Sequence, residues 1–184
     1  MIAISDIAPR VTVTEENVSA TIASPGPQGP TGPAAAPALF GSFYSTQRQQ
    51  IAADTAAAMT LSNTDIFDGV SVVAGSEITF TTAGVYDLQF SAQVHHLGGG
   101  GNGLDLYVWF KLNGTNIPWS ATRVVIPKNH YEVIAWDYLF EVDAGDHVEL
   151  FWQVNNTDII LEQQTASGNV PAVPSLIVTV MQVR

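Results

Sequence analysis

The sequence predicts an all-β protein: a homotrimeric jelly-roll β-sandwich head that follows an N-terminal β arm and a short collagen-like neck. Short β-rich segments recur over residues 39–184, each bounded by a turn signal. Apolar and polar residues alternate within them, as in strands with one buried face. A collagen-like run and a last strand that is apolar on both faces indicate threefold symmetry. The expected parts are the arm (1–24), the neck (25–38) and the head (39–184).

The first part, residues 1–24, is expected to anchor the protein. Apolar residues alternate with polar ones in two short runs, and residues 15–17 form a plausible turn between them. An isolated hairpin is marginally stable in water, so its symmetry mates or a larger partner must support it. The apolar residues expected to bind that partner are Ile2, Ile4, Ile7, Val11, Val13, Val18 and Ile22.

The neck has Gly at every third position, and Pro follows each of these glycines. Three polyproline II chains wind together only when every third residue is Gly, which predicts a trimer. The run is too short to hold three chains by itself, and the register stops at Ala35. A Pro/Gly linker with accidental periodicity is the alternative. The neck residues are Gly26, Pro27, Gly29, Pro30, Gly32 and Pro33.

The head is expected to contain many short strands with one buried face each, which is typical of a β-sandwich or jelly roll. Residues 86, 88, 90, 92 and 94 illustrate the alternation, since all five are apolar or aromatic. Residues 47–58 have a helix-like composition, although an irregular connection fits equally well. The expected strands are approximately 40–46, 58–62, 69–73, 77–81, 85–94, 104–112, 122–126, 131–142, 147–154, 159–164 and 176–183.

The last expected strand, 176–183, is mostly apolar on both faces, which indicates that both faces are covered. In a trimer, one face packs into the sandwich and the other meets neighbouring chains. The residues expected at the trimer interface are Leu176, Ile177, Val178, Val180 and Met181.

The charge balance excludes several partners. Six basic and 17 acidic residues give a net charge of −11, so three copies carry three times −11, or −33. Such a surface repels nucleic acids and anionic membranes, and no apolar run approaches 18 residues, so neither nucleic-acid binding nor membrane insertion is expected. The chain has no cysteine and no secretion-signal pattern at its N-terminus, which favours a soluble protein synthesised in a reducing cytoplasm.

No pattern of residues indicates catalysis, a metal ion or a cofactor. His95 and His96 are adjacent on an expected strand, so their side chains point to opposite faces and do not easily share one ion. The glycine-rich segment 98–103 lacks the Lys and the strand-to-helix context of a phosphate loop, and we expect a floppy connection there. Four carboxylates lie near expected turns: Asp65, Asp68, Asp143 and Asp146. They lack EF-hand spacing, and Asp is common in turns because its side chain hydrogen-bonds the nearby backbone.

Aromatic residues are the remaining candidates for ligand contact. Trp136 and Trp152 lie on the buried faces of their strands and are expected in the core. Trp119 falls in an expected turn. Tyr107 and Trp109 lie on the expected strand 104–112, on the face opposite its apolar residues. Exposed aromatic rings can stack on sugars or bind partner proteins, which would make these three residues contact residues. The alternative is that they pack at the rim of their own fold.

One strand carries a family resemblance. Residues 84–90, Gly-Val-Tyr-Asp-Leu-Gln-Phe, are similar to a core strand of the complement-head and tumour-necrosis-factor-like trimeric jelly rolls. Phe80 lies closer to Gly84 than in that family, and the Cys of many animal members is absent. The resemblance implies a trimeric jelly roll.

The order of arm, collagen-like neck and head also resembles small structural proteins of tailed bacteriophages. Segments 111–115, 144–150 and 171–175 are similar to stretches of their heads. The resemblance implies a virion-surface head fibre or decoration protein bound to the capsid shell protein. The alternative is a tail or baseplate receptor-binding tip that recognises a host glycan.

Overall fold

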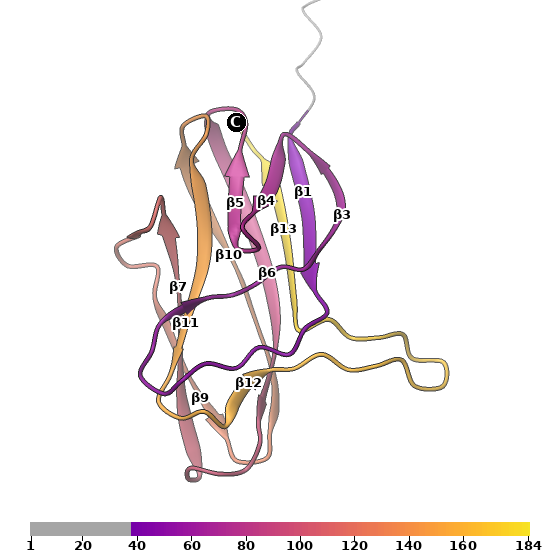
Figure 1. Cartoon of the computed structure of the whole chain (residues 1–184). Helices are drawn as coiled ribbons and strands as arrows, with labels where there is room; N and C mark the ends of the chain where they lie inside the picture. Colours follow the sequence, from indigo (N-terminus) through magenta and orange to yellow (C-terminus); the bar gives the residue numbers. More distant parts are fainter. Residues whose placement is uncertain (1–37) are drawn as a thin grey trace, which may run out of the picture. The chain divides into compact units, whose positions relative to one another are not determined.

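The computed structural model describes residues 38–184, which form a sandwich of two antiparallel sheets and confirm the all-β fold class (Figure 1). Sheet A has the order β10-β6-β13-β1-β3, and β12 also pairs with β6. Sheet B has the order β4-β5-β11-β7-β8, with β2 on β11 and β9 on β7. Apart from the consecutive pairs β4-β5 and β7-β8, neighbouring strands are not consecutive in sequence, as in a jelly roll.

The strands of sheet A are β1 (Phe40–Ser45), β3 (Asn63–Asp68), β6 (Gly84–His96), β10 (Tyr131–Val142), β12 (Ile159–Leu161) and β13 (Leu176–Gln182). Those of sheet B are β2 (Ala57–Ala58), β4 (Val70–Val73), β5 (Glu77–Phe80), β7 (Gly103–Leu112), β8 (Thr115–Asn116), β9 (Thr122–Pro127) and β11 (His147–Val154). The described residues include no helix that is long and apolar enough to cross a membrane.

The predicted arm and most of the predicted neck lie outside the described residues. The anchoring role of the seven apolar arm residues and the trimeric role of the six neck residues therefore stay predictions. Within the head, residues 47–56 form an irregular connection, tied to β12 by the Gln49–Leu161 bridge. The expected strand over 58–62 contributes only Ala58 to β2, and the one over 159–164 ends at Leu161.

The core lies between the inner faces of the two sheets. The predicted alternation in β6 is confirmed, since Tyr86, Leu88, Phe90, Ala92 and Val94 are all buried. Trp152 is fully buried and Trp136 is partly buried against the core, so both core predictions hold. Phe110 of sheet B joins the layers, with its ring centroid 6.1 Å from that of Phe90 and 5.2 Å from that of Phe140 in sheet A. These contacts fix the distance between the sheets.

β13 corrects part of the predicted trimer interface. Leu176, Val178 and Val180 are at most 1% exposed and pack inside the sandwich, so they offer no surface to another chain. Ile177 and Met181 point outward and are 39% and 53% exposed. The strand is a central one between β6 and β1, so its alternation follows the ordinary rule for a one-sided core. Of the five residues predicted at the trimer interface, only Ile177 and Met181 remain candidates.

The described chain begins and ends at the same end of the sandwich. Leu39 accepts a backbone hydrogen bond from Gln182 at 2.8 Å, and Phe40 pairs with Met181. At the opposite end lie the connections β6–β7, β9–β10 and β11–β12 (Figure 1).

Candidate functional site

The outer face of β1 and β13 is an uncharged surface at the middle of sheet A. Ile177, Thr179 and Met181 of β13 point outward beside Phe40, Ser42 and Tyr44 of β1, and none of these side chains is charged at neutral pH. The flanking strands place Asp87 beside Met181 and Asp68 beside Phe40. Ile66 of the neighbouring β3 is 58% exposed. A hollow of about 270 Å³ opens on this face and is lined by Ala38, Leu39, Phe40, Gly41, Ser42, Ile66, Thr179 and Met181. The face offers apolar side chains and shape, and no catalytic group.

Trp119 lies on a strained turn and is completely exposed. Ser120 closes the turn, since its N–H donates to the Ile117 carbonyl at 3.4 Å and its hydroxyl donates to the same oxygen at 2.9 Å. Pro118 therefore occupies the second turn position, and Trp119 occupies the third with φ of +65°. Gly or Asn is usual there, and a bulky side chain costs roughly 1 kcal/mol or more.

The turn is fixed to the body of the domain through Ser120. This residue is 4% exposed, and its hydroxyl oxygen accepts a hydrogen bond from the Phe110 backbone N–H at 3.1 Å. The indole of Trp119 is 100% exposed and contributes nothing to the core. A rigid support and a free aromatic ring are what a contact residue requires, because little conformational entropy is lost on binding.

The structure separates the other two predicted contact residues from Trp119. Tyr107 and Trp109 lie on the outer face of β7, which pairs with β11 on one side and with β8 and β9 on the other. Trp109 is half-buried: its indole N–H donates to Asn116 Oδ1 at 2.9 Å, and its ring packs on Phe151 at 5.8 Å. Tyr107 is 36% exposed. Of the three, Trp119 alone is wholly free of contacts that its own fold needs.

The two histidines diverge as expected of neighbours on a strand. His96 is fully buried, with Nδ1 3.2 Å from the Ile126 carbonyl and Nε2 2.7 Å from the Gly99 carbonyl. His95 lies on the outer face, stacked on the Tyr131 ring at 3.8 Å, with Nδ1 2.9 Å from Glu162 Oε2. Both rings are engaged by their own chain. Across residues 38–184, no three His, Cys, Asp or Glu residues converge as a metal site would require.

Of the four carboxylates expected near turns, Asp146 has a backbone hydrogen-bond partner. Asp146 accepts hydrogen bonds from the Asn113 side chain at 2.7 Å and from the Asp143 N–H at 2.8 Å. These hydrogen bonds, the one from Asn113 first, hold the pKa of Asp146 below its ordinary value. Asp65 and Asp68 lie in β3, an edge strand, and the prediction of a turn for them is wrong.

Part of the glycine-rich connection lies against neighbouring connections, although residues 99–103 are exposed; its expected flexibility stays a prediction. A Cβ on Gly98, Gly99 or Gly100 would overlap the side chains of Asn129, Asp158 and Asn156, respectively. Side chains from two other connections thus occupy the space that these glycines leave open. The segment is a structural contact at one end of the sandwich.

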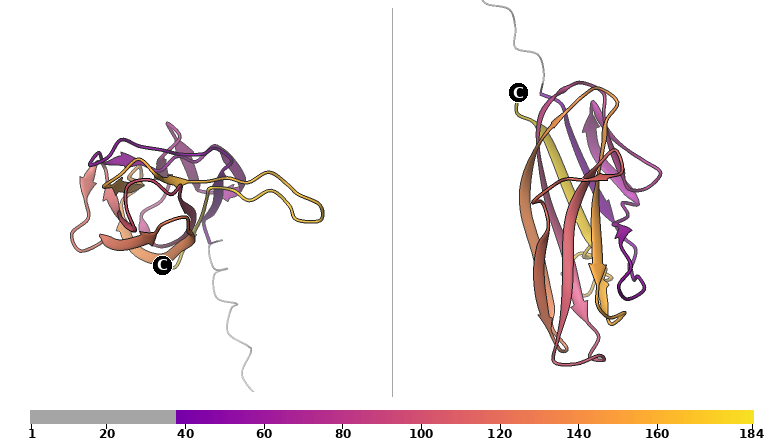
Figure 2. Two further views of the ribbon diagram at one scale, coloured as in Figure 1. Left: turned by 90° about the horizontal axis from the view of Figure 1, so that it is seen from below. Right: turned by 90° about the vertical axis from the view of Figure 1, so that its left-hand side faces the viewer.

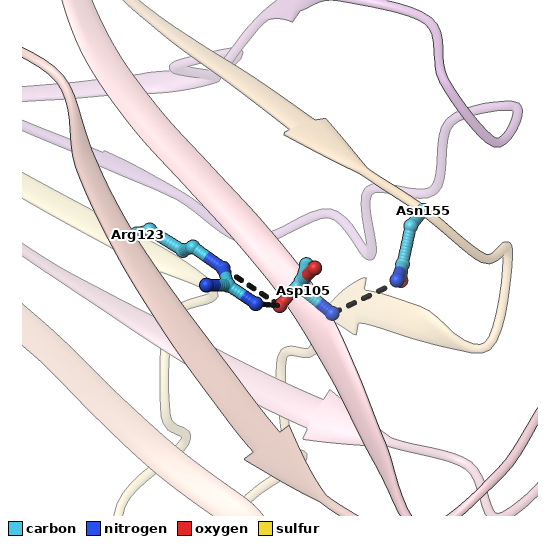
Figure 3. Close-up of polar contacts among 3 residues, drawn as sticks. All are labelled: Asp105, Arg123 and Asn155. Atoms are coloured by element: carbon cyan, nitrogen blue, oxygen red, sulfur yellow. Dashed lines mark hydrogen bonds and ion pairs between the residues drawn. The ribbon is translucent and has the colours of Figure 1, made fainter.

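Figure 3 shows a further polar contact, at the β7–β9 edge. Arg123 of β9 donates from Nε and Nη2 to one carboxylate oxygen of Asp105, at 2.9 and 2.8 Å. The Asp105 backbone N–H in turn donates to Asn155 Oδ1 at 3.0 Å. The pair joins β9 to β7 and to the segment after β11, which gives it a structural role.

No family model matches the sequence, and no curated protein matches it. Among solved structures, the chain is similar to Eiger TNF from S. frugiperda, with a TM-score of 0.54 and 7% sequence identity, over 81% of this chain and 94% of that one. At this identity the likeness shows the fold alone. It confirms the tumour-necrosis-factor-like jelly roll that the strand at 84–90 predicts.

Proposed function

We propose that the chain is a non-enzymatic structural protein of a tailed-bacteriophage virion: a homotrimeric head fibre or capsid decoration protein. Residues 1–24 bind the capsid shell protein, and the jelly roll is carried on the virion surface after synthesis in the host cytoplasm. The mechanism is binding, and linkage of three arms gives avidity beyond one weak contact. Support comes from the collagen-like register, the phage-like segments of the sequence and the fold of the head.

The observation that carries the trimer is the uncharged outer face of β1 and β13. In a chain with a net charge of −11, copies repel one another except where their surfaces lack charge. Outward Ile177 and Met181, together with the apolar hollow beside them, supply such a surface at the centre of sheet A. Apolar packing of this face around a threefold axis would hold the three collagen-like segments together.

The experiment is to measure the mass of the purified full-length chain by sedimentation and mass photometry at micromolar and nanomolar concentrations. A mass of three chains is expected. A stable monomer at micromolar concentration would refute the proposal. Antibody labelling of the phage particle then locates the protein: label on the shell supports the decoration role, and label on the tail supports the alternative.

The alternative function is a tail or baseplate receptor-binding tip that recognises a host surface glycan, and Trp119 favours it. The fold tolerates a strained backbone at a side chain that the core does not use. Strain of this kind is common at binding sites. An exposed indole stacks on the apolar face of a sugar ring, and the acidic chain favours neutral sugars over anionic ones.

A glycan array tests this alternative with the full-length protein. Binding by the wild type that Trp119→Ala abolishes, with the oligomer mass unchanged, would support it. Phe67→Ala is the matched control, because Phe67 is also an exposed aromatic residue, 59% exposed, on the edge strand β3. Equal binding by the wild type and Trp119→Ala would exclude Trp119 as the contact.

A further inference from the structure

A β-ribbon formed by residues 164–173 projects from the sandwich between β12 and β13. Figures 1 and 2 show it extending beyond the body of the domain in perpendicular views. Gln164 and Val173 exchange both backbone hydrogen bonds at 2.9 Å, and Ser167 and Val170 exchange both at 3.0 Å. Gly168 opens the two-residue turn with φ of +59°, where a type II′ turn places Gly. We call this segment the ribbon.

The ribbon has a fixed base and an uncovered remainder. Ser175, directly after it, is fully buried, and its hydroxyl donates to the Gln47 carbonyl at 2.6 Å while its N–H donates to the Ser45 carbonyl at 2.9 Å. All nine residues of 164–172 are exposed, and Val170 near the tip is 61% exposed. A two-stranded ribbon without further packing is marginally stable in water. It gains stability when another surface covers it.

The composition of this segment suits an acidic partner. No ionisable side chain occurs from Gln163 to Val183, although the chain as a whole carries 17 acidic and 6 basic residues. A charge-free segment approaches an acidic protein without like-charge repulsion and offers nothing to a basic or anionic partner. The acidic protein that is always present is a second copy of this chain.

The position and the length of the ribbon are consistent with a contact to a second copy of the chain. The ribbon leads directly into β13, whose outward residues belong to the face proposed above as the trimer contact. Four residues in each strand of the ribbon, joined by the two-residue turn, extend it by roughly 13 Å, at about 3.3 Å per residue. That reach exceeds the separation of about 10 Å between two packed sheets, so the tip extends past the rim of its own domain.

We infer that the ribbon packs on the neighbouring copy of the chain and clasps the oligomer. The inference rests on the proposed trimer and deepens it, because it assigns a specific element to the contact between copies. The tip residues Val170 and Pro171 are then buried by the neighbour, and the ribbon's unpaired backbone edge is shielded from other chains.

Cysteine labelling of the full-length protein tests this, because the natural chain has no cysteine. Val170→Cys introduces one thiol near the tip. Val73→Cys, on β4 of sheet B, is the matched control, since Val73 is 49% exposed. In the native oligomer, we expect a maleimide to react with Cys at 170 at least tenfold more slowly than with Cys at 73. After dissociation by denaturant, the two rates should be equal.

The outcomes separate the two proposals when the mass is measured on the same samples. A trimer in which both thiols react equally fast overturns the ribbon contact and leaves the trimer standing. A monomer overturns both. A protected thiol at 170 in a particle of three chains supports both.

A ribbon deletion provides a second measurement. Replacing residues 165–172 by Asn-Gly closes the ribbon directly after the Gln164–Val173 pair with a turn suited to a hairpin. The far-UV circular dichroism should keep its β character, whereas the oligomer should dissociate at a concentration at least tenfold higher than the wild type. An unchanged dissociation curve would contradict the inference, because the ribbon would then be dispensable between copies.

Discussion

Met181→Asp places a charge in the face that is proposed to join the three chains. Complete burial of a Met or Ile side chain stabilises by roughly 1.5–3 kcal/mol. Met181 is 53% exposed and Ile177 is 39% exposed in the single chain, so contact with a neighbour would gain about 1 kcal/mol from each. The substitution removes the Met contribution and adds the desolvation of a carboxylate, which is of the order of several kcal/mol when the charge is buried.

The expected result is a folded protein that no longer forms trimers at micromolar concentration. Residue 181 points away from its own core but pairs with Asp87 of β6, so the two like charges should lower the free energy of unfolding of the monomer by roughly 0.2–1 kcal/mol and leave it folded. Sedimentation equilibrium reports the mass, and urea denaturation followed by tryptophan fluorescence reports the folding. The two readouts separate assembly from folding.

The control is Val73→Asp, a similar change at a side chain of similar exposure on sheet B. It should leave the trimer intact. If Met181→Asp keeps the wild-type mass and dissociation curve, the outer face of β13 is not the contact and the reasoning fails. If both variants dissociate, added negative charge alone is responsible.

Three further predictions concern the sandwich itself and are measured by denaturation. Gly41→Ala should destabilise by about 1–3 kcal/mol, because its Cβ would lie 2.5 Å from two ring atoms of the buried Phe43; urea midpoints that match the wild type would contradict this. Ser120→Ala should cost about 1–3 kcal/mol, since the Phe110 N–H loses its acceptor. Asp146→Asn should unfold more easily than the wild type above about pH 4, the pKa of the carboxyl in the unfolded chain, because folding lowers the pKa of Asp146. The difference in the free energy of unfolding should disappear as the pH falls through the lower pKa of the folded state. A difference that persists at pH 2 would contradict that assignment.

The long strands could be predicted because their alternation reports a local property, burial of one face. In β6, β7 and β11, every second residue enters the same core, and the sequence alone shows this period. The edge strand β3, Asn63–Asp68, has no buried face: five of its six residues are exposed, and it carries two aspartates. Charged residues are usual on exposed edges, and they remove the very period by which a strand is recognised.

The exposure of a predicted contact residue could be predicted where it depends on neighbours in sequence, and not where it depends on residues of another strand. The exposure of Trp119 follows from its turn, which Asn116-Ile117-Pro118 already indicates. The engagement of Trp109 depends on Phe151 of another strand, and no spacing along the chain reports that contact. The same holds for the glycine-rich connection, whose neighbours Asn129 and Asp158 are distant in sequence. The ribbon had a visible Ser-Gly-Asn turn signal, but its projection from the domain depends on where β12 and β13 end.

The entry and exit of the domain at one end have a practical consequence for anyone who wishes to display a peptide on this scaffold. A tag fused after Arg184 would emerge beside the point where Leu39 begins the fold. An insertion at residues 128–130, between β9 and β10, would emerge at the far end (Figure 1). That connection is the better site for cargo that must lie far from both ends of the described chain.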